Sequence, residues 1–521
     1  MSRSALLALA VPAAFLVGCG DNKDGASDAG ADGNGVCAPT PPEKPSSGVL
    51  ADPEAIDLGA DCVAGGLRTL PGRWWLREKE FTVKNQFDFE YPRFEGDCTQ
   101  GFRRANWKDE DTDLADGVTY QTWSDGTRFY TRLYNRFDSP QGTFEYADVL
   151  DVCMTADGSL AGVHIISQTG RDDQIVTEKG TPFSPHEPEV AKGLSLVGEL
   201  NTAGIKKQVA YDIAVDGNYA YMASPDGLQI IDITDPTHPT HVHQIPGDLN
   251  DITLYRNGAQ LIGYGAPFDG QTTQILDLSD PHSAFQVNTI FSYSHTIEIT
   301  PNTTPPKMYF GNYTDHVPIY DITTPTTPTL IASVPIPGGD VNGIHDTFIS
   351  GSRIYANKTN DGVYAVDVSS GTATPTLLGH VATEYSHNTY EGVVNGKRIA
   401  IHGDEGMTPM GGAYMRIIDA EETSPTFMQV IGTFQTRHEV GIHNMVIKDN
   451  KAYVAYYQDG VRIIDLTDPT HPTEVGHYNT FDNDTAPGEG FEGALGLAIV
   501  GDLIYVADDL RDLVILRIDP T

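Results

Sequence analysis

The sequence predicts an all-β protein, a seven-bladed β-propeller that follows a small antiparallel β domain. Three observations lead to this fold class. A segment of apolar and turn residues recurs along the C-terminal part of the chain, and each copy lies among β-forming runs. The last copy has no fourth strand after it, and a segment before the first copy has the pattern of this missing strand. Repeats of about 40–50 residues that each supply four strands are typical of propeller blades.

The repeat is clearest in two copies, LQIIDITDPTHPT at residues 228–240 and VRIIDLTDPTHPT at residues 461–473. Five weaker copies follow the same plan, at residues 274–281, 317–323, 363–369, 415–420 and 513–519. The intervals between copies are mostly 44 to 46 residues and lengthen to 52, as read from the aspartates Asp232, Asp277, Asp321, Asp367, Asp419 and Asp465. Arg517 takes the place of the aspartate in the seventh copy.

Each copy is expected to contribute four strands. In the sixth unit the predicted strands are residues 444–447, 451–455, 460–466 and 474–478, and Asp468-Pro469 interrupts the ladder. The apolar run of the third strand fits a strand that is buried on both faces. The seventh unit has no fourth strand of its own. Because residues 194–200 match the pattern of a fourth strand, we expect them to close the ring and leave no open edge.

The segments LQIID and VRIID, each followed by Asp-Pro-x-x-Pro, resemble the LVIVD repeat of bacterial surface and secreted β-propellers. The resemblance extends over residues 194–521, is specific in the first and sixth units and is looser elsewhere. It implies the propeller fold and an extracellular location, but no particular reaction.

The N-terminus has the features of an export signal. A short basic start precedes an apolar stretch at residues 4–17, and Leu16-Val17-Gly18-Cys19 follows. This order resembles the bacterial lipobox, which implies lipidation of Cys19 and attachment to a membrane through that lipid. The alternative is an ordinary signal peptide with an incidental cysteine. Gly20 stands where an aspartate would retain a lipoprotein at the inner membrane, so the outer membrane or cell surface is favoured.

The chain is therefore expected to have four parts. Residues 1–19 are the signal peptide, and residues 20–61, rich in Asp, Gly and Pro, form a disordered tether. Residues 62–193 contain aromatic, β-forming runs and are expected to fold as the antiparallel β domain, and residues 194–521 form the propeller. Beyond Cys19, an even number of cysteines in an oxidising compartment predicts two disulfides. Connectivity cannot be read from the sequence; pairing in order along the chain joins Cys37 to Cys62 and Cys98 to Cys153.

The net charge of −38 is spread along the 521 residues. Such an acidic surface repels nucleic acid, which we exclude as the main partner. It suits divalent cations or basic partners, and it also keeps an exported protein soluble.

Histidines recur at the predicted mouth of the propeller channel. Alignment of the units by their second strands places Asp251, His295, His345 and His443 at equivalent positions near the start of the innermost strand. His387 lies two residues early in its own unit, which a β-bulge can absorb. The loops after the second strands add acidic residues. The full set of ligand or metal candidates is His295, His345, His387, His443, Asp251, Asp346, His402, Asp404, Glu405, Asp508 and Asp509.

Imidazoles surrounded by carboxylates at one end of a channel suit a transition metal, or general bases beside a substrate. Repeats also copy residues, so the same histidines can simply pack the channel. The sequence contains no nucleophile elbow, no His-Glu-x-x-His motif and no phosphate-binding glycine loop. The favoured function is therefore a cell-envelope scaffold that binds a protein, glycan or small ligand. The alternative is a metal-dependent enzyme, such as a hydrolase, with a divalent metal at the channel mouth.

Overall fold

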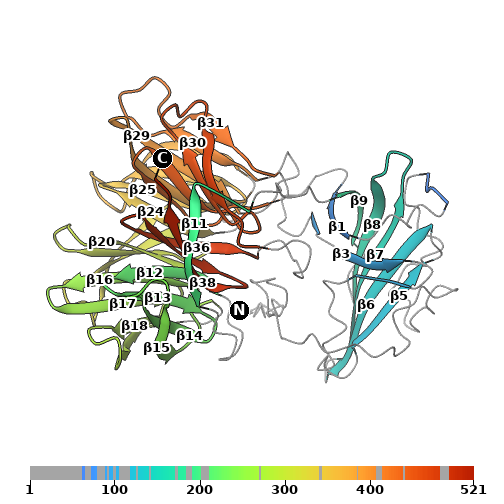
Figure 1. Cartoon of the computed structure of the whole chain (residues 1–521), viewed down its shortest axis with the longest axis horizontal. Helices are drawn as coiled ribbons and strands as arrows, with labels where there is room; N and C mark the ends of the chain where they lie inside the picture. Colours follow the sequence, from blue (N-terminus) through green and yellow to red (C-terminus); the bar gives the residue numbers. More distant parts are fainter. Residues whose placement is uncertain are drawn as a thin grey trace, which may run out of the picture.

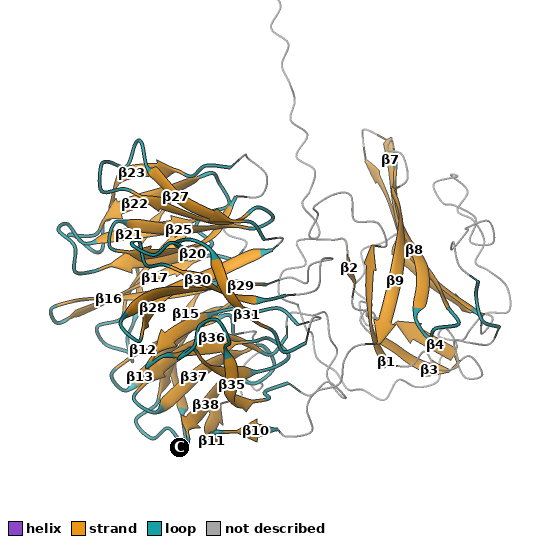
Figure 2. Ribbon diagram, turned by 90° about the horizontal axis from the view of Figure 1, so that it is seen from above, coloured by secondary structure: helices purple, strands orange, loops and turns teal. Residues whose placement is uncertain are grey.

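The computed structural model describes residues 61–64, 72–78, 89–90, 93–97, 101–104, 118–124, 127–139, 142–169, 174–182, 190–200, 210–268, 272–338, 343–383, 385–405, 413–437, 440–481 and 492–520. Every regular element in these ranges is a β-strand (Figure 2), and no helix there is long and apolar enough to span a membrane. The predicted signal peptide, Cys19 and all but the end of the predicted tether lie outside the described residues.

The N-terminal region forms one antiparallel sheet of nine strands, in the order β4-β3-β1-β9-β8-β7-β6-β5 with β2 paired to β1. Its strands are β1 (Gly72–Glu78), β2 (Phe89–Glu90), β3 (Arg93–Asp97), β4 (Gly101–Arg104), β5 (Val118–Ser124), β6 (Arg128–Ser139), β7 (Gly142–Met154), β8 (Leu160–Gln168) and β9 (Gln174–Pro182). The buried side chains described here include Phe129, Leu150 and Val163. No strand of this sheet pairs with a strand of the propeller in the described part of the chain.

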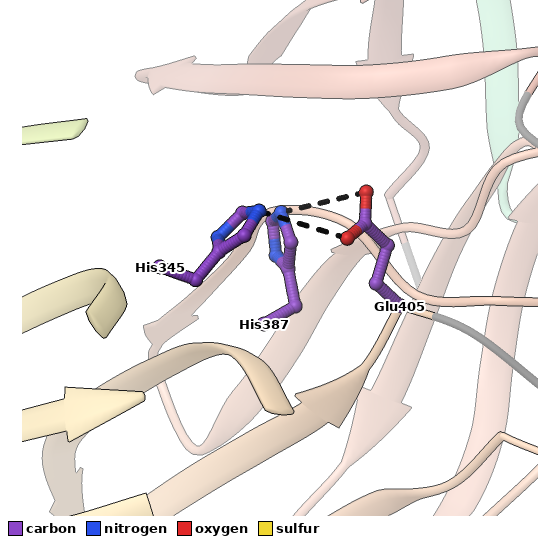
Figure 3. A group of neighbouring side chains, drawn as sticks. All are labelled: His345, His387 and Glu405. Atoms are coloured by element: carbon purple, nitrogen blue, oxygen red, sulfur yellow. Dashed lines mark ion pairs between the residues drawn. The ribbon is translucent and has the colours of Figure 1, made fainter. Parts of the chain in front are cut away.

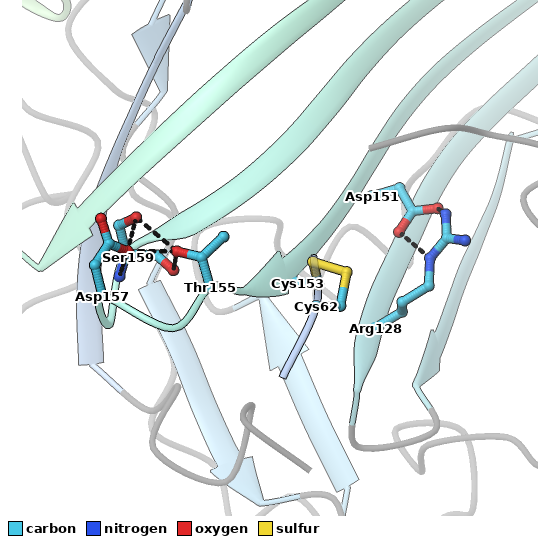
Figure 4. Close-up of a disulfide and its surroundings, with 7 residues drawn as sticks. All are labelled: Cys62, Arg128, Asp151, Cys153, Thr155, Asp157 and Ser159. Atoms are coloured by element: carbon cyan, nitrogen blue, oxygen red, sulfur yellow. Dashed lines mark hydrogen bonds and ion pairs between the residues drawn. A yellow bond between two sulfur atoms is a disulfide. The ribbon is translucent and has the colours of Figure 1, made fainter. Parts of the chain in front are cut away.

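A disulfide joins Cys62 to Cys153, across 91 residues and with the two Cα atoms 5.6 Å apart (Figure 4). The expected pairing of neighbours in the chain is therefore wrong for both cysteines, while Cys37 and Cys98 lie outside the described residues. Pairing depends on proximity in space. The amide of Val63 donates to the carbonyl of Met154, at 2.8 Å, which holds Cys62 beside the end of β7.

Residues 212–518 form seven antiparallel sheets, which we call blades 1 to 7 (Figure 1). Blades 1 to 4 consist of β12 (Asp212–Asp216), β13 (Tyr219–Ser224), β14 (Gly227–Asp232), β15 (Thr240–Pro246); β16 (Asp251–Asn257), β17 (Gln260–Ala266), β18 (Thr273–Asp277), β19 (Phe285–Ile290); β20 (Thr296–Thr300), β21 (Lys307–Gly311), β22 (His316–Asp321), β23 (Thr329–Pro335); and β24 (Ile344–Ser350), β25 (Arg353–Lys358), β26 (Gly362–Asp367), β27 (Thr376–Val381). Blades 5 to 7 consist of β28 (Ser386–Val394), β29 (Lys397–Asp404), β30 (Met415–Asp419), β31 (Val430–Phe434); β32 (Met445–Lys448), β33 (Lys451–Ala455), β34 (Val461–Asp465), β35 (Thr473–Tyr478); and β36 (Ala494–Val500), β37 (Leu503–Asp508), β38 (Asp512–Ile518).

An N-terminal strand closes the ring. Strand β11 (Leu194–Leu200) pairs with β38 from Leu194↔Ile518 to Leu200↔Leu513 and supplies the fourth strand of blade 7. Figure 1 shows this pair as a green strand beside a dark red one. The first strand of blade 1, β12, packs against β36 of blade 7, and a short strand, β10 (Ala191–Lys192), adds to the outer edge of blade 6. The fold class expected from the sequence is confirmed.

The aspartate of the repeat has a structural role in the turn after the third strand. Its carboxylate accepts a hydrogen bond from the amide two residues later, at 2.8 Å from Thr234 to Asp232 and 2.7 Å from Thr467 to Asp465. This Asx-type turn directs the chain toward the fourth strand. Blade 7 has no such turn, because β11 arrives from the other end of the sequence. The turn is therefore not needed after β38, where Arg517 replaces the aspartate.

Candidate functional site

The innermost strands carry the histidines at equivalent positions in their blades. The amides of Tyr211, Asn250, His295 and His443 all donate to the second strand of their own blade, to the carbonyls of Ala223, Ala266, Gly311 and Ala455. These four residues are therefore structurally equivalent. Asn250, not Asp251, stands level with the histidines, because Asp251 is the next residue and pairs with Ala266.

His345 and His387 reach the same level through β-bulges. The pairing register shifts between Ile344 and Asp346 in blade 4 and between Ser386 and Asn388 in blade 5, so each histidine is the extra residue. A bulge re-aims the side chain that it carries. The expectation that a bulge absorbs the two-residue offset of His387 is wrong, because His345 has the same bulge without an offset. The offset reflects a longer hairpin, since β28 has 9 residues and β24 has 7.

Four consecutive blades bring their imidazoles into one row, which we call the histidine arc: His295, His345, His387 and His443. The ring centroids are 4.2 Å apart for the first pair, 4.5 Å for the second and 4.3 Å for the third. His345 and His387, in the middle, are 4% and 2% exposed, and the two outer imidazoles are half-buried.

Glu405 completes the centre of the arc (Figure 3). It directly follows β29, and its carboxylate oxygens lie 3.7 Å from Nε2 of His345 and 3.9 Å from Nε2 of His387. The ligand atoms of these three buried residues all lie within 4.8 Å of one another. We call His345, His387 and Glu405 the central triad.

Tyrosines extend the site on both sides. Tyr313, Glu405 and Tyr457 occupy equivalent positions in blades 3, 5 and 6, two residues beyond the pairing partner of the inner strand. The hydroxyl of Tyr457 donates to Glu405 at 2.6 Å, and the Tyr313 ring lies 4.8 Å from that of His295. Neither tyrosine was among the candidates expected from the sequence, although the alignment that found Glu405 passes through both positions.

Burial controls the charge of the site. Burial lowers the pKa of His295 to about 3 and that of His443 to about 4. Burial also lowers the pKa of His345 and of His387 well below the usual value, and at these two residues the neighbouring imidazoles add to the effect. Burial also raises the pKa of Glu405 to about 7. The imidazoles are therefore neutral at neutral pH, which is the form that binds a metal.

The geometry of the central triad suits a transition-metal ion. Bonds of about 2.0–2.1 Å to a tetrahedral ion place neighbouring ligand atoms about 3.3 Å apart. The separations of 3.7 and 3.9 Å run to the two different oxygens of Glu405 and are too long for hydrogen bonds. The three ligand atoms, which lie within 4.8 Å of one another, would move closer together around a bound ion. Two imidazole nitrogens and one carboxylate oxygen form a donor set used by zinc and iron, and three protein ligands leave a coordination position open.

Asp251 and Asp346 lie on the inner strands, each one residue after the position that carries the histidine in the arc. The carboxylate of Asp251 accepts the amide of Ile297 at 2.6 Å, and that of Asp346 accepts the Asn388 side chain at 2.6 Å. Both bonds link neighbouring blades. Burial, together with the nearby Asp212, raises the pKa of Asp251, and burial raises that of Asp346 to about 6. These side chains hold the ring together and are not part of the central triad.

The remaining candidates are engaged elsewhere. His402 is fully buried within blade 5, with Nδ1 3.1 Å from the Thr389 hydroxyl, and Asp404 forms an ion pair with Arg416. Asp508 accepts the amides of Leu510 and Arg511 at 3.1 and 3.0 Å and so caps the turn after β37. Asp509 is buried, with its amide bonded to the carbonyl of Gly493.

The ring of four-stranded antiparallel sheets defines the chain as a β-propeller protein, and its repeats match a family model. The LVIVD repeat model matches residues 209–245, 443–480 and 493–519, so the chain contains LVIVD repeats in these three segments. No curated protein matches it. The repeat propeller suggests a scaffold for protein interactions, although a fold alone does not define a ligand.

Several solved structures are similar to the chain at low identity. Hydrazine synthase of Kuenenia stuttgartiensis is 14% identical with a TM-score of 0.45, and the match covers 62% of this chain and 100% of that one. BamB of Moraxella catarrhalis is 10% identical with a TM-score of 0.40, covering 62% and 97%. The WD40 repeats of RRP9 are 9% identical with a TM-score of 0.45, covering 62% and 96%. We draw no functional conclusion from these similarities.

Proposed function

We propose that the propeller binds one divalent transition-metal ion through His345, His387 and Glu405 at the mouth of its channel. The observation that carries this proposal is the convergence of three buried ligand atoms within 4.8 Å. The site also lacks the internal hydrogen bonds of a purely structural cluster. Nδ1 of His345 and of His387 is buried with no hydrogen-bond partner among the described residues, and the Nε2 atoms that face Glu405 lie too far from it for a hydrogen bond.

Elemental analysis of the full chain, purified without a histidine tag, tests the proposal. We expect one equivalent of zinc, copper, nickel, iron or manganese, and its loss in His345→Ala and Glu405→Gln. His316→Ala is the matched control, because His316 is a half-buried histidine beside a carboxylate, Asp315, on the same propeller. Wild-type protein that is isolated without metal and takes up none of these ions would contradict the proposal.

The open coordination position supports a second candidate function, metal-dependent hydrolysis. An ion with three protein ligands can hold and activate a water molecule, as catalytic zinc sites do. The test compares hydrolysis of activated esters by the metal-loaded protein, the metal-free protein and Glu405→Gln. Activity that requires both the ion and Glu405 would support catalysis, and equal rates in all three would leave the protein a binding protein.

We also propose that the protein is anchored in the bacterial cell envelope through a lipid on Cys19, at the outer membrane or cell surface. The order Leu16-Val17-Gly18-Cys19 supports this location. Incorporation of labelled palmitate into the wild type and its absence from Cys19→Ser is the expected result, and labelling of both proteins would contradict it.

An envelope scaffold is compatible with the metal centre. Outer strands of blades 2, 3 and 4 expose apolar side chains, with Phe285 54%, Leu330 55% and Leu377 48% exposed. Such residues suit contacts with a protein or glycan partner. Replacing all three with serine is expected to abolish capture of such a partner from envelope extracts and to leave the metal content unchanged.

A further inference from the structure

The two outer imidazoles of the histidine arc differ in the contacts that hold them, so the two ends of the arc are not equivalent. His295 and His443 are both half-buried and both lie next to a member of the central triad. From their equivalent positions in the repeat, His295 and His443 would be expected to act alike. The side chains and carbonyls around them differ, so they do not.

His443 is fixed in place. Its Nδ1 lies 2.9 Å from the carbonyl of Leu495, and because a carbonyl only accepts, Nδ1 carries the hydrogen. The Tyr457 ring packs edge-on at 5.3 Å, and Tyr457 and Leu495 are both 0% exposed. Rotation of this imidazole would break the hydrogen bond and disturb fully buried neighbours.

His295 lies at the more open end. Its Nδ1 is 3.5 Å from the Tyr293 hydroxyl, a separation at which a hydrogen bond is weak. The ring packs beside Tyr313, which is 38% exposed. The imidazole can therefore turn toward solvent at a lower cost than His443.

The spacing allows an ion to pass inward by exchange of one ligand at a time. The His295 ring is 4.2 Å from that of His345, which is as close as the 4.5 Å between the two imidazoles of the central triad. An ion held by His295 can therefore bind His345 before it leaves His295. His345 and His387, at 4% and 2% exposed, have little direct access to solvent.

We infer that His295 is the entry ligand of the metal site: it captures the ion from solvent and passes it to His345, His387 and Glu405, and it is the first ligand met on release. This inference rests on the proposed metal-binding function. His295 acts only while the ion enters or leaves the site, and it is not a ligand of the bound ion.

A residue on the entry route changes both rates and leaves the affinity unchanged. By microscopic reversibility, its removal slows association and dissociation by the same factor. Removal of a resident ligand instead weakens the equilibrium affinity. The two roles are therefore distinguishable without knowledge of the natural metal.

Stopped-flow mixing of Co²⁺ with the full-length, metal-free protein, followed by visible absorbance, measures these rates. We expect His295→Ala to bind one equivalent with the wild-type dissociation constant, with association and chelator-induced release both slowed several-fold. His443→Ala is the matched control on the closed flank, and its association rate should equal that of the wild type. His295→Gln provides a second variant if His295→Ala does not fold.

Each other result has a defined meaning. Unchanged rates in His295→Ala and His295→Gln, or equal slowing in His443→Ala, would overturn the entry role. A weaker affinity with an unchanged association rate would make His295 a resident ligand and would also overturn it. Failure of the wild type to bind Co²⁺ would instead count against the proposed metal-binding function.

Discussion

Glu298 lies in β20 on the innermost strand of blade 3, three residues after His295. Burial raises the pKa of its carboxyl from the ordinary 4.5 to about 8, and the nearby Asp346 adds to the shift. Folding therefore requires this group to keep its proton at neutral pH, whereas the unfolded chain releases it. Burial thus keeps the Glu298 carboxyl and the imidazoles of the histidine arc uncharged at neutral pH.

This shift gives the protein a pH-dependent stability. Between pH 4.5 and about 8 the folded state holds a proton that the unfolded state loses, so the wild type should lose stability as the pH rises through this window. Each unit of pKa shift corresponds to about 1.4 kcal/mol. Glu298→Gln should match the wild type near pH 5 and be more stable by a few kcal/mol at pH 8.5, as measured by urea denaturation.

Asp321→Asn is the control for that measurement, because Asp321 is a solvated turn carboxylate whose pKa is lowered by hydrogen bonds from Thr323. Its substitution should not remove the loss of stability toward pH 8. If Glu298→Gln and the wild type show the same pH dependence, the carboxyl is ionised in the folded protein and burial does not keep it protonated.

Tyr457 illustrates a residue that acts through another. Its hydroxyl donates to Glu405 at 2.6 Å and orients the carboxylate toward the two imidazoles. Loss of such an outer hydrogen bond typically reduces metal affinity about 10- to 100-fold. We expect Tyr457→Phe to retain one metal equivalent at reduced affinity, measured by competition with a chelator. Tyr456→Phe is the neighbouring control, since its buried hydroxyl accepts the amide of Thr436 instead; an equal loss in both variants would point to general destabilisation.

At the scale of elements, the blades were predictable because their signals are local. The sixth unit was expected at residues 444–447, 451–455, 460–466 and 474–478, and its strands are Met445–Lys448, Lys451–Ala455, Val461–Asp465 and Thr473–Tyr478. Alternating apolar residues and Asx turns set these boundaries within a residue or two. The partner of Cys153 depends on segments far apart in the sequence, so no local pattern indicated it. Glu405 was among the candidates, but no local pattern indicated that it meets His345 and His387.

The start of the third strand depends on a glycine in blade 6. Gly460 has φ +66°, and a Cβ on it would lie 2.2 Å from the carbonyl oxygen of Tyr478, so the β34–β35 pairing tolerates no side chain there. Gly217 is the control, with φ +59° and no atom within 4 Å of the position that a Cβ would occupy. Gly217→Ala should cost about 1 kcal/mol from its left-handed backbone alone. Gly460→Ala should cost clearly more in urea denaturation, and equal losses would show that the strand moves aside.

At the scale of the whole molecule, the histidine arc depends on a ring whose last blade is completed by β11. Leu194 lies 3% exposed in that strand and packs in a core with Leu497, Ile504 and Leu516 of blade 7. The four imidazoles come from blades 3 to 6, and neighbouring blades support one another through their inner strands. The ring should therefore unfold as one cooperative unit, and the metal site should depend on a closure that none of its own residues makes.

Leu194→Asp tests this dependence, because an unpaired carboxylate in that core costs several kcal/mol. We expect a lower urea midpoint and, at intermediate urea, loss of bound Co²⁺ absorbance that coincides with loss of β-sheet circular dichroism. Leu196→Asp is the matched control on the same strand, since Leu196 is 44% exposed. If bound metal is retained after part of the β-sheet circular dichroism is lost, the blades unfold independently and the histidine arc needs only its immediate neighbours. Coincident loss would mean that a strand from the N-terminal side of the ring maintains the metal site.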